Sequence, residues 1–116
     1  MHEYPVAEKI LKIALTTANE NKASKITKIS LVVGDLSGFI GESIQMYFEI
    51  ISKGTKAENA QIIIKPVRAK LKCSSCGKYF ERKGYSFECP ECGGKGEISD
   101  IGKEFYIENI EIENID

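Results

Sequence analysis

Apolar residues recur every three or four positions near the start of the chain, which is the period of a helix with one buried face. The pattern runs from Pro5 to about Glu20. Proline suits the first helical position because its missing N–H would have no partner there. Since Pro5 also favours extended geometry for Tyr4, residues 1–4 are expected to lie outside the helix. The apolar positions are Val6, Ala7, Ile10, Leu11, Ile13, Ala14 and Ala18.

A second helix is predicted over residues 42–53, where Ile44 and Phe48 fall on one apolar face. Gly54 follows at the position where a residue with positive φ commonly ends a helix. Between the two helices, residues 26–33 are rich in β-branched side chains and alternate in polarity, which predicts a strand.

Two later segments also have strand patterns. The first begins at residues 62–65, is expected to break at Pro66, and resumes as far as Leu71; the last strand spans residues 103–115. Between them lies a segment that holds all four cysteines and almost no aliphatic residues. This order predicts an α+β fold, with two helices on a small mixed sheet of about three strands and an inserted four-cysteine ribbon.

Composition narrows the class of protein. The chain has 116 residues, of which 42% are hydrophobic and 28% are charged, enough for one modest core. No apolar run approaches the roughly 20 residues that span a bilayer, and the first residues lack the basic and apolar parts of a secretory signal. We therefore expect a cytoplasmic protein with reduced cysteines and no membrane partner.

The four cysteines form two C-x2-C pairs, Cys73 with Cys76 and Cys89 with Cys92, and 12 residues separate the pairs. Each pair can form a tight turn that presents two sulfurs to one ion, and two such turns complete a tetrahedral site. The spacing therefore predicts a ribbon that holds structural zinc. Two disulfides or scattered buried thiols are disfavoured in a reducing compartment, and iron, which a tetrahedron of sulfurs also accommodates, is the main rival metal.

Other residues of the ribbon support a metal site. Gly77 and Gly93 each follow a second cysteine, where the backbone often needs positive φ and directs amides toward sulfur. So small a segment cannot be held by burial alone, whereas structural zinc contributes roughly 10–16 kcal/mol in small finger peptides. Four aromatic residues between the turns are expected to form a small apolar layer: Tyr79, Phe80, Tyr85 and Phe87.

Charge argues against a nucleic-acid partner. The formal net charge of the chain is -1. Between Lys70 and Glu97, six basic residues face four acidic ones, and a zinc ion with four thiolates cancels that excess of two charges. The ribbon therefore lacks the basic surface that a nucleic-acid binder needs. A zinc-ribbon nucleic-acid-binding or adaptor protein remains the alternative function, and this charge balance disfavours it.

The only histidine of the chain is His2, which is followed by Glu3. A lone terminal histidine is commonly an accident on a frayed end. The Met1 amine, the His2 amide nitrogen and imidazole, and the Glu3 amide nitrogen could alternatively surround one ion in a plane, an arrangement that suits Ni(II) or Cu(II). The residues alone leave both interpretations open.

Several motifs occur together in order: Met1-His2-Glu3, an amphipathic helix, Gly34-Asp35-Leu36, Gly54-Thr55-x-Ala57-Glu58-x-Ala60, and the two cysteine pairs. In this combination the chain resembles the hydrogenase maturation nickel metallochaperone family (HypA/HybF) over essentially its whole length. The resemblance implies that Met1, His2 and Glu3 bind nickel as a transient cargo, and that Cys73, Cys76, Cys89 and Cys92 hold structural zinc.

The resemblance also implies partners and domains. The family delivers nickel to the precursor of the [NiFe]-hydrogenase large subunit with a partner GTPase, and in some organisms also serves urease. Residues 1–69 and 102–116 would then form a nickel-binding domain, and residues 70–101 a zinc-ribbon domain. We expect a monomer or homodimer. The chain lacks a catalytic triad or a phosphate-binding loop, so we expect no enzymatic activity.

Overall fold

The computed structural model describes residues 3–114 of the chain. These residues group into two compact units. The first comprises residues 3–32, 39–65 and 106–114, and the second comprises residues 33–38 and 66–105. The elements in order are α1 (Glu3–Glu20), β1 (Lys25–Gly34), α2 (Gly41–Ile51), β2 (Gln61–Val67), β3 (Leu71–Cys73), β4 (Tyr79–Phe80), β5 (Gly96–Ile98) and β6 (Phe105–Glu113).

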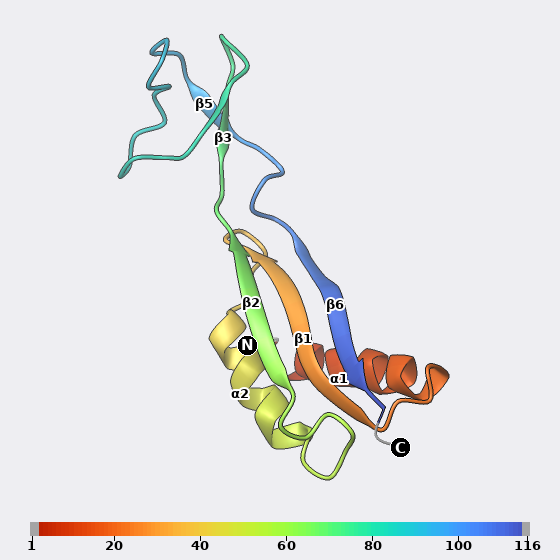
Figure 1. Cartoon of the computed structure of the whole chain (residues 1–116). Helices are drawn as coiled ribbons and strands as arrows, with labels where there is room; N and C mark the ends of the chain where they lie inside the picture. Colours follow the sequence, from red (N-terminus) through yellow and green to blue (C-terminus); the bar gives the residue numbers. More distant parts are fainter. Residues whose placement is uncertain (1–2, 115–116) are drawn as a thin grey trace. The chain divides into compact units, whose positions relative to one another are not determined.

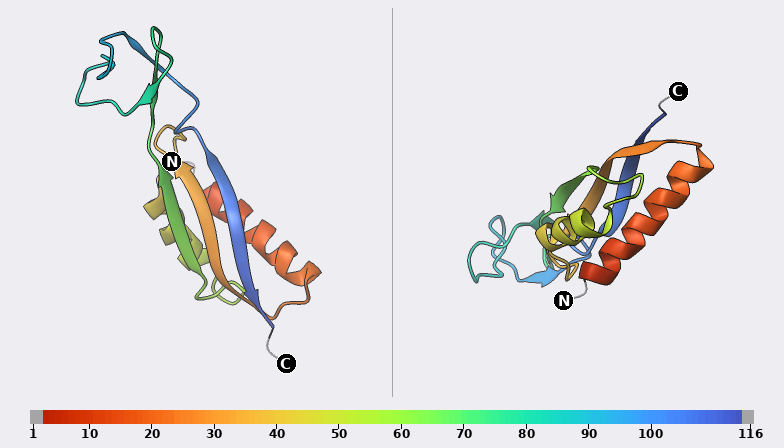
Figure 2. Two further views of the ribbon diagram at one scale, coloured as in Figure 1. Left: turned by 45° about the horizontal axis from the view of Figure 1, so that its top comes forward. Right: turned by 90° about the horizontal axis from the view of Figure 1, so that it is seen from below.

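Strands β2, β1 and β6 form a three-stranded sheet in that order. β1 and β2 run in the same direction and are joined through α2, whereas β6 runs opposite to β1 (Figure 1). Both helices lie on one face of this sheet (Figure 2). The predicted α+β class, with two helices on a mixed sheet of three strands, is confirmed.

The core lies between this sheet and the two helices. Its largest fully buried side chains include Phe48 and Ile44 of α2 and Ile29 and Leu31 of β1. The buried positions of α1 repeat every three or four residues, as the sequence predicts, and three of them are alanines, which allow a close approach. The buried positions are Glu3, Ala7, Ile10, Ala14 and Ala18.

The expectation that residues 1–4 lie outside the first helix is wrong for the described part of that segment, because α1 begins at Glu3. Pro5 therefore occupies the third helical position. This costs no hydrogen bond, since the first four N–H groups of a helix have no intrahelical partner. Contacts with α2 hold Glu3 and Tyr4 in the first turn, and these contacts are not visible in the local sequence.

The predicted break at Pro66 is also wrong. β2 continues through Pro66 to Val67, and the extended chain is interrupted only at residues 68–70. Proline is tolerated here because β2 is an edge strand of its sheet, so one side of its backbone needs no ladder partner.

The turn after α2 explains one of the sequence motifs. Gly54 has positive φ as predicted, but it lies two residues beyond the C-cap residue, Ser52. The Thr55 hydroxyl donates to the Ser52 carbonyl at 2.6 Å and accepts from the Ala57 amide at 3.0 Å. Ala57 is fully buried. The motif therefore forms a structural turn.

The Gly34-Asp35 motif lies where two segments of the second unit meet. A Cβ on Gly34 would lie 2.0 Å from the Gly102 carbonyl oxygen, so only glycine fits. The Asp35 amide donates to the Val67 carbonyl at 2.9 Å, and its carboxylate accepts from the Ala69 amide at 3.0 Å. These bonds hold the chain that enters the ribbon. Across residues 3–114, neither helix combines the length and apolarity that a membrane span requires.

Candidate metal centres

The sulfur atoms of the four cysteines lie together in the second unit, all within 4.8 Å of one another. Cys73 and Cys89 are buried, whereas Cys76 and Cys92 are exposed. The Sγ atoms of Cys73 and Cys92 are 3.4 Å apart, and those of Cys76 and Cys89 are 3.8 Å apart. The cysteines are free, so the disulfide alternative does not describe this arrangement.

The two cysteine turns have the same hydrogen bonds. In the first, the Cys73 amide donates to the Lys78 carbonyl at 2.9 Å, and the Gly77 amide donates to the Cys73 carbonyl at 3.0 Å. In the second turn, the Cys89 amide donates to the Gly94 carbonyl at 2.8 Å, and the Gly93 amide donates to the Cys89 carbonyl at 2.9 Å. Gly77 and Gly93 both have φ of 75°, which confirms the positive φ predicted at these positions.

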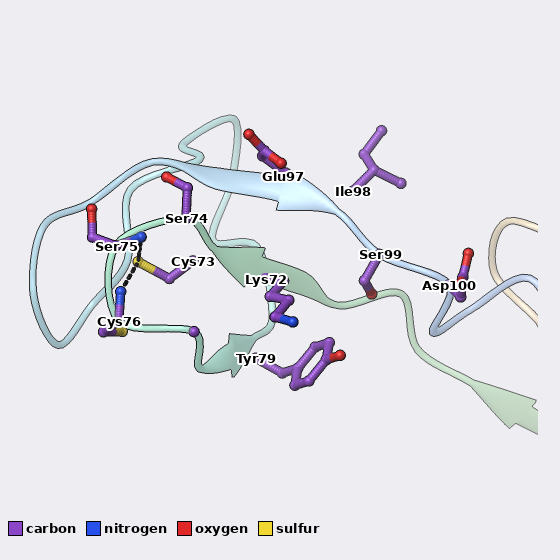
Figure 3. Close-up of a pocket in the computed structure, with 11 residues that line it drawn as sticks. Lys72, Cys73, Ser74, Ser75, Cys76, Tyr79, Glu97, Ile98, Ser99 and Asp100 are labelled. Atoms are coloured by element: carbon purple, nitrogen blue, oxygen red, sulfur yellow. Dashed lines mark hydrogen bonds between the residues drawn. The ribbon is translucent and has the colours of Figure 1, made fainter.

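Backbone amides point at the sulfurs. The amides of Ser75 and Cys76 each donate to the Cys73 Sγ at 3.4 Å (Figure 3). In the second turn, the Gly94 amide donates to the Cys92 Sγ at 3.4 Å. Such donors stabilise negative charge on sulfur, which is the state that binds a metal.

This donor set fits a tetrahedral ion. Sulfurs placed 2.3 Å from a central zinc would be separated by about 3.8 Å, close to the two separations observed here. All four positions of a tetrahedron are then filled by sulfur. The four cysteines are therefore placed so that they could hold one ion in a site closed by sulfur.

The thiols do not ionise alike. The pKa of Cys73 is lowered to about 6, first because the Cys76 amide donates to its sulfur and then because the Ser75 amide does. For Cys92, the Gly94 amide lowers the pKa, but hydrogen bonding with the neighbouring cysteine sulfurs outweighs it and raises the pKa to about 12. Gathering all four sulfurs as thiolates thus requires a cation among them.

A lysine supplies further positive charge beside the site. Lys78 forms a salt bridge with Glu91, and the pKa of Lys78 is raised, first by the hydrogen bond to the Glu91 carboxylate. The sulfurs of Cys76 and Cys89 raise it further through their charge. Lys78 therefore stays protonated next to the thiolates and offsets part of their charge.

The predicted aromatic layer does not form. Tyr85 is 94% exposed, and Tyr79 and Phe87 are also exposed; only Phe80 is half-buried. The Arg82 guanidinium instead lies 4.4 Å from the centre of the Phe87 ring. The exposed rings therefore contribute little burial to the ribbon.

Of the three residues expected to bind nickel, the structure describes only Glu3. Met1 and His2 lie outside the described residues. Glu3 is the first residue of α1, and its side chain is only 3% exposed. Its Oε2 accepts a hydrogen bond from the Ile40 amide at 3.2 Å.

The sequence did not predict two residues that contact the candidate ligands, Gly94 and Ile40. A Cβ on Gly94 would lie 2.9 Å from the Cys73 Sγ, so this glycine is needed for space. The doubled glycine after Cys92 was the available signal. Ile40 offers only its backbone amide to Glu3, and no side-chain pattern could have indicated that contact.

Comparisons with a family model and with curated proteins point to the same family. Residues 1–112 match the family described as "Hydrogenase/urease nickel incorporation, metallochaperone, hypA". The chain is 45% identical to the hydrogenase maturation factor HypA of Caldanaerobacter subterraneus subsp. tengcongensis, across 97% of this chain and 100% of that protein. It is 37% identical to the HypA of Dehalococcoides mccartyi, across 98% of this chain and 96% of that protein.

Two solved structures share the fold. One is a solution structure of a HypA protein, with a TM-score of 0.68, 23% identity, and coverage of 97% of this chain and 96% of the other. The second is the solution structure of the Ni metallochaperone HypA from Helicobacter pylori, with a TM-score of 0.62, 22% identity, and coverage of 99% and 100%. By its match over nearly its full length, the chain belongs to the HypA family of hydrogenase maturation factors.

Proposed function

We propose that this protein is a nickel metallochaperone that binds Ni(II) at its amino terminus and delivers it during maturation of [NiFe]-hydrogenase. The ligands are the Met1 amine, the amide nitrogen and imidazole of His2, and the amide nitrogen of Glu3. Four nitrogens in a plane suit Ni(II). The observation that carries the proposal is the family match from residue 1 to residue 112, which includes the Met-His-Glu start.

The start of α1 is compatible with this role. Glu3 lies in the first helical turn, where backbone N–H groups have no intrahelical partner. Its amide nitrogen can therefore turn toward an ion without breaking the helix. In this role the chain is a carrier rather than an enzyme, because an ion can pass to a client by ligand exchange without a catalytic side chain.

We propose zinc for the four-cysteine site, held by Cys73, Cys76, Cys89 and Cys92. A bound zinc would supply a structural crosslink, and a site closed by four sulfurs leaves no position for water activation. In this proposal, the nickel-binding domain comprises residues 1–69 and 102–116, and the zinc-ribbon domain comprises residues 70–101.

The proposed partners follow from the family. They are the maturation GTPase and the precursor of the hydrogenase large subunit, in the cytoplasm, with urease as an additional client. The protein acts as a monomer or homodimer, without nucleic acid or membrane.

The test compares the protein with a native amino terminus against the same protein with one residue added before Met1. Metal analysis should find one zinc in each, and calorimetric titration should find tight nickel binding only with the native terminus. Equal nickel affinity in the two proteins would refute the amine as a ligand. Iron as the native metal in metal-replete cells would refute zinc.

A further inference from the structure

The carboxylate of Glu3 has a partner within the fold. It is buried at 3% exposure, and its Oε2 accepts from the Ile40 amide at 3.2 Å. A buried carboxylate is costly without such partners. Ile40 is the N-cap residue of α2 and makes no side-chain capping bond, so a carboxylate 37 positions earlier lies at the positive end of that helix.

The next residue makes a second contact with the same helix. The rings of Tyr4 and Tyr47 meet edge to face, with centroids 5.4 Å apart and an angle of 82° between their planes. Tyr47 belongs to α2. Two consecutive residues of the first turn of α1 are thus fixed to α2 by independent interactions.

We propose that the Glu3 carboxylate is a positioning group for nickel and not a nickel ligand. This inference rests on the proposed function, in which the Glu3 backbone amide is a ligand. The contact with Ile40 holds the backbone of residue 3, so less conformational freedom is lost when its amide nitrogen binds the ion. A metal bound at Oε2 would instead compete with the Ile40 amide for the oxygen to which this amide donates.

Four variants with native amino termini test the proposal by nickel titration. Glu3→Ala removes the anchor and keeps every nitrogen ligand, whereas Glu3→Gln keeps an oxygen that can accept from Ile40. Tyr47→Leu removes the aromatic contact from a position remote in sequence. Ala18→Gly is the control, because it weakens α1 at a buried position near its other end.

We expect Glu3→Ala and Tyr47→Leu to weaken nickel binding about tenfold, which corresponds to about 1.4 kcal/mol. Glu3→Gln should lose less affinity than Glu3→Ala. The visible absorption of the planar nickel complex should stay unchanged in all variants, because the four nitrogens remain. Ala18→Gly should lower the unfolding temperature and leave nickel affinity as it is.

Other results would overturn the proposal. An altered nickel spectrum in Glu3→Gln, with a normal Tyr47→Leu, would make the carboxylate a ligand. Wild-type affinity in Glu3→Ala, or an equal loss in Ala18→Gly, would remove the positioning role. The proposed function fails separately, through a His2→Ala variant that binds nickel as tightly as the wild type.

Discussion

Gly94 lies against the sulfurs of the four-cysteine centre, and a methyl group there should weaken zinc binding. A Cβ at this position would lie 2.9 Å from the Cys73 Sγ and 2.8 Å from the Ser75 Oγ. Non-bonded carbon atoms prefer about 3.5–4.0 Å, and sulfur is larger, so the Cys73 sulfur would have to move by at least about 0.6 Å. Metal–ligand distances tolerate only about 0.2 Å.

The size of the effect follows from the cost of overpacking, about 1–3 kcal/mol. We therefore expect Gly94→Ala to raise the zinc dissociation constant by about 5- to 150-fold. The assay is competition with a chromophoric chelator, combined with the absorption spectrum of the cobalt-substituted protein, which reports the geometry of the sulfurs. Because the displaced atom is itself a ligand, the cobalt spectrum should change as well.

Two companion variants separate the possible causes. Gly77→Ala imposes the left-handed backbone cost of about 1–2 kcal/mol, but its Cβ would meet nothing within 4 Å, so the cobalt spectrum should stay normal. Adding Ser75→Gly to Gly94→Ala relieves the contact with Ser75 but not that with Cys73. Full rescue by this second change, or a normal zinc affinity in Gly94→Ala alone, would refute the reasoning.

Three further outcomes are expected. Nickel affinity should fall as the pH drops from about 7.5 to 6, because protonation of the His2 imidazole (ordinary pKa about 6.5) competes with the metal; affinity that is constant over this range in a calorimetric titration would contradict imidazole ligation. Zinc removal by a chelator should unfold the ribbon and speed tryptic cleavage at Arg82 and Lys83, while circular dichroism still shows the helices. An unchanged cleavage rate would show that the ribbon is ordered without metal. Phe48→Ala should lower the free energy of unfolding, measured in urea, by about 3–5 kcal/mol, because Phe48 is only 1% exposed. Met46→Ala on the same helix should cost much less, since Met46 is 51% exposed, and equal losses would contradict the assigned core.

Periodicity predicted the helices and the first sheet because their faces are selected by burial, which leaves a repeating pattern. It could not place the start of α1, since Glu3 and Tyr4 are held there by Ile40 and Tyr47. Local rules for proline were overridden in both cases where they were applied. In α1 the missing N–H had no intrahelical partner to lose, and in β2 the strand lies at a sheet edge.

The cysteine site was predictable because ligand spacing within a turn is a local property. The same holds for the positive φ at Gly77 and Gly93. The need for glycine at position 94 was not predictable, because it depends on the distance to Cys73, which lies 21 positions away. The exposure of Tyr85 was missed for the related reason that an aromatic residue is buried only where a second layer exists to cover it.

The two proposed metal sites place different demands on the chain. The cysteine centre joins two turns that are distant in sequence, and amides of Ser75, Cys76 and Gly94 are already directed at its sulfurs. Loss of that ion would undo the main crosslink of the ribbon, so exchange is coupled to unfolding and should be slow. A site made of Met1, His2 and the Glu3 amide involves only consecutive residues at one end of α1. Its ion can leave after local protonation while Glu3 stays bonded to Ile40 and the helix remains intact. If nickel binds as proposed, the fold therefore separates a metal that must be retained from one that must be released.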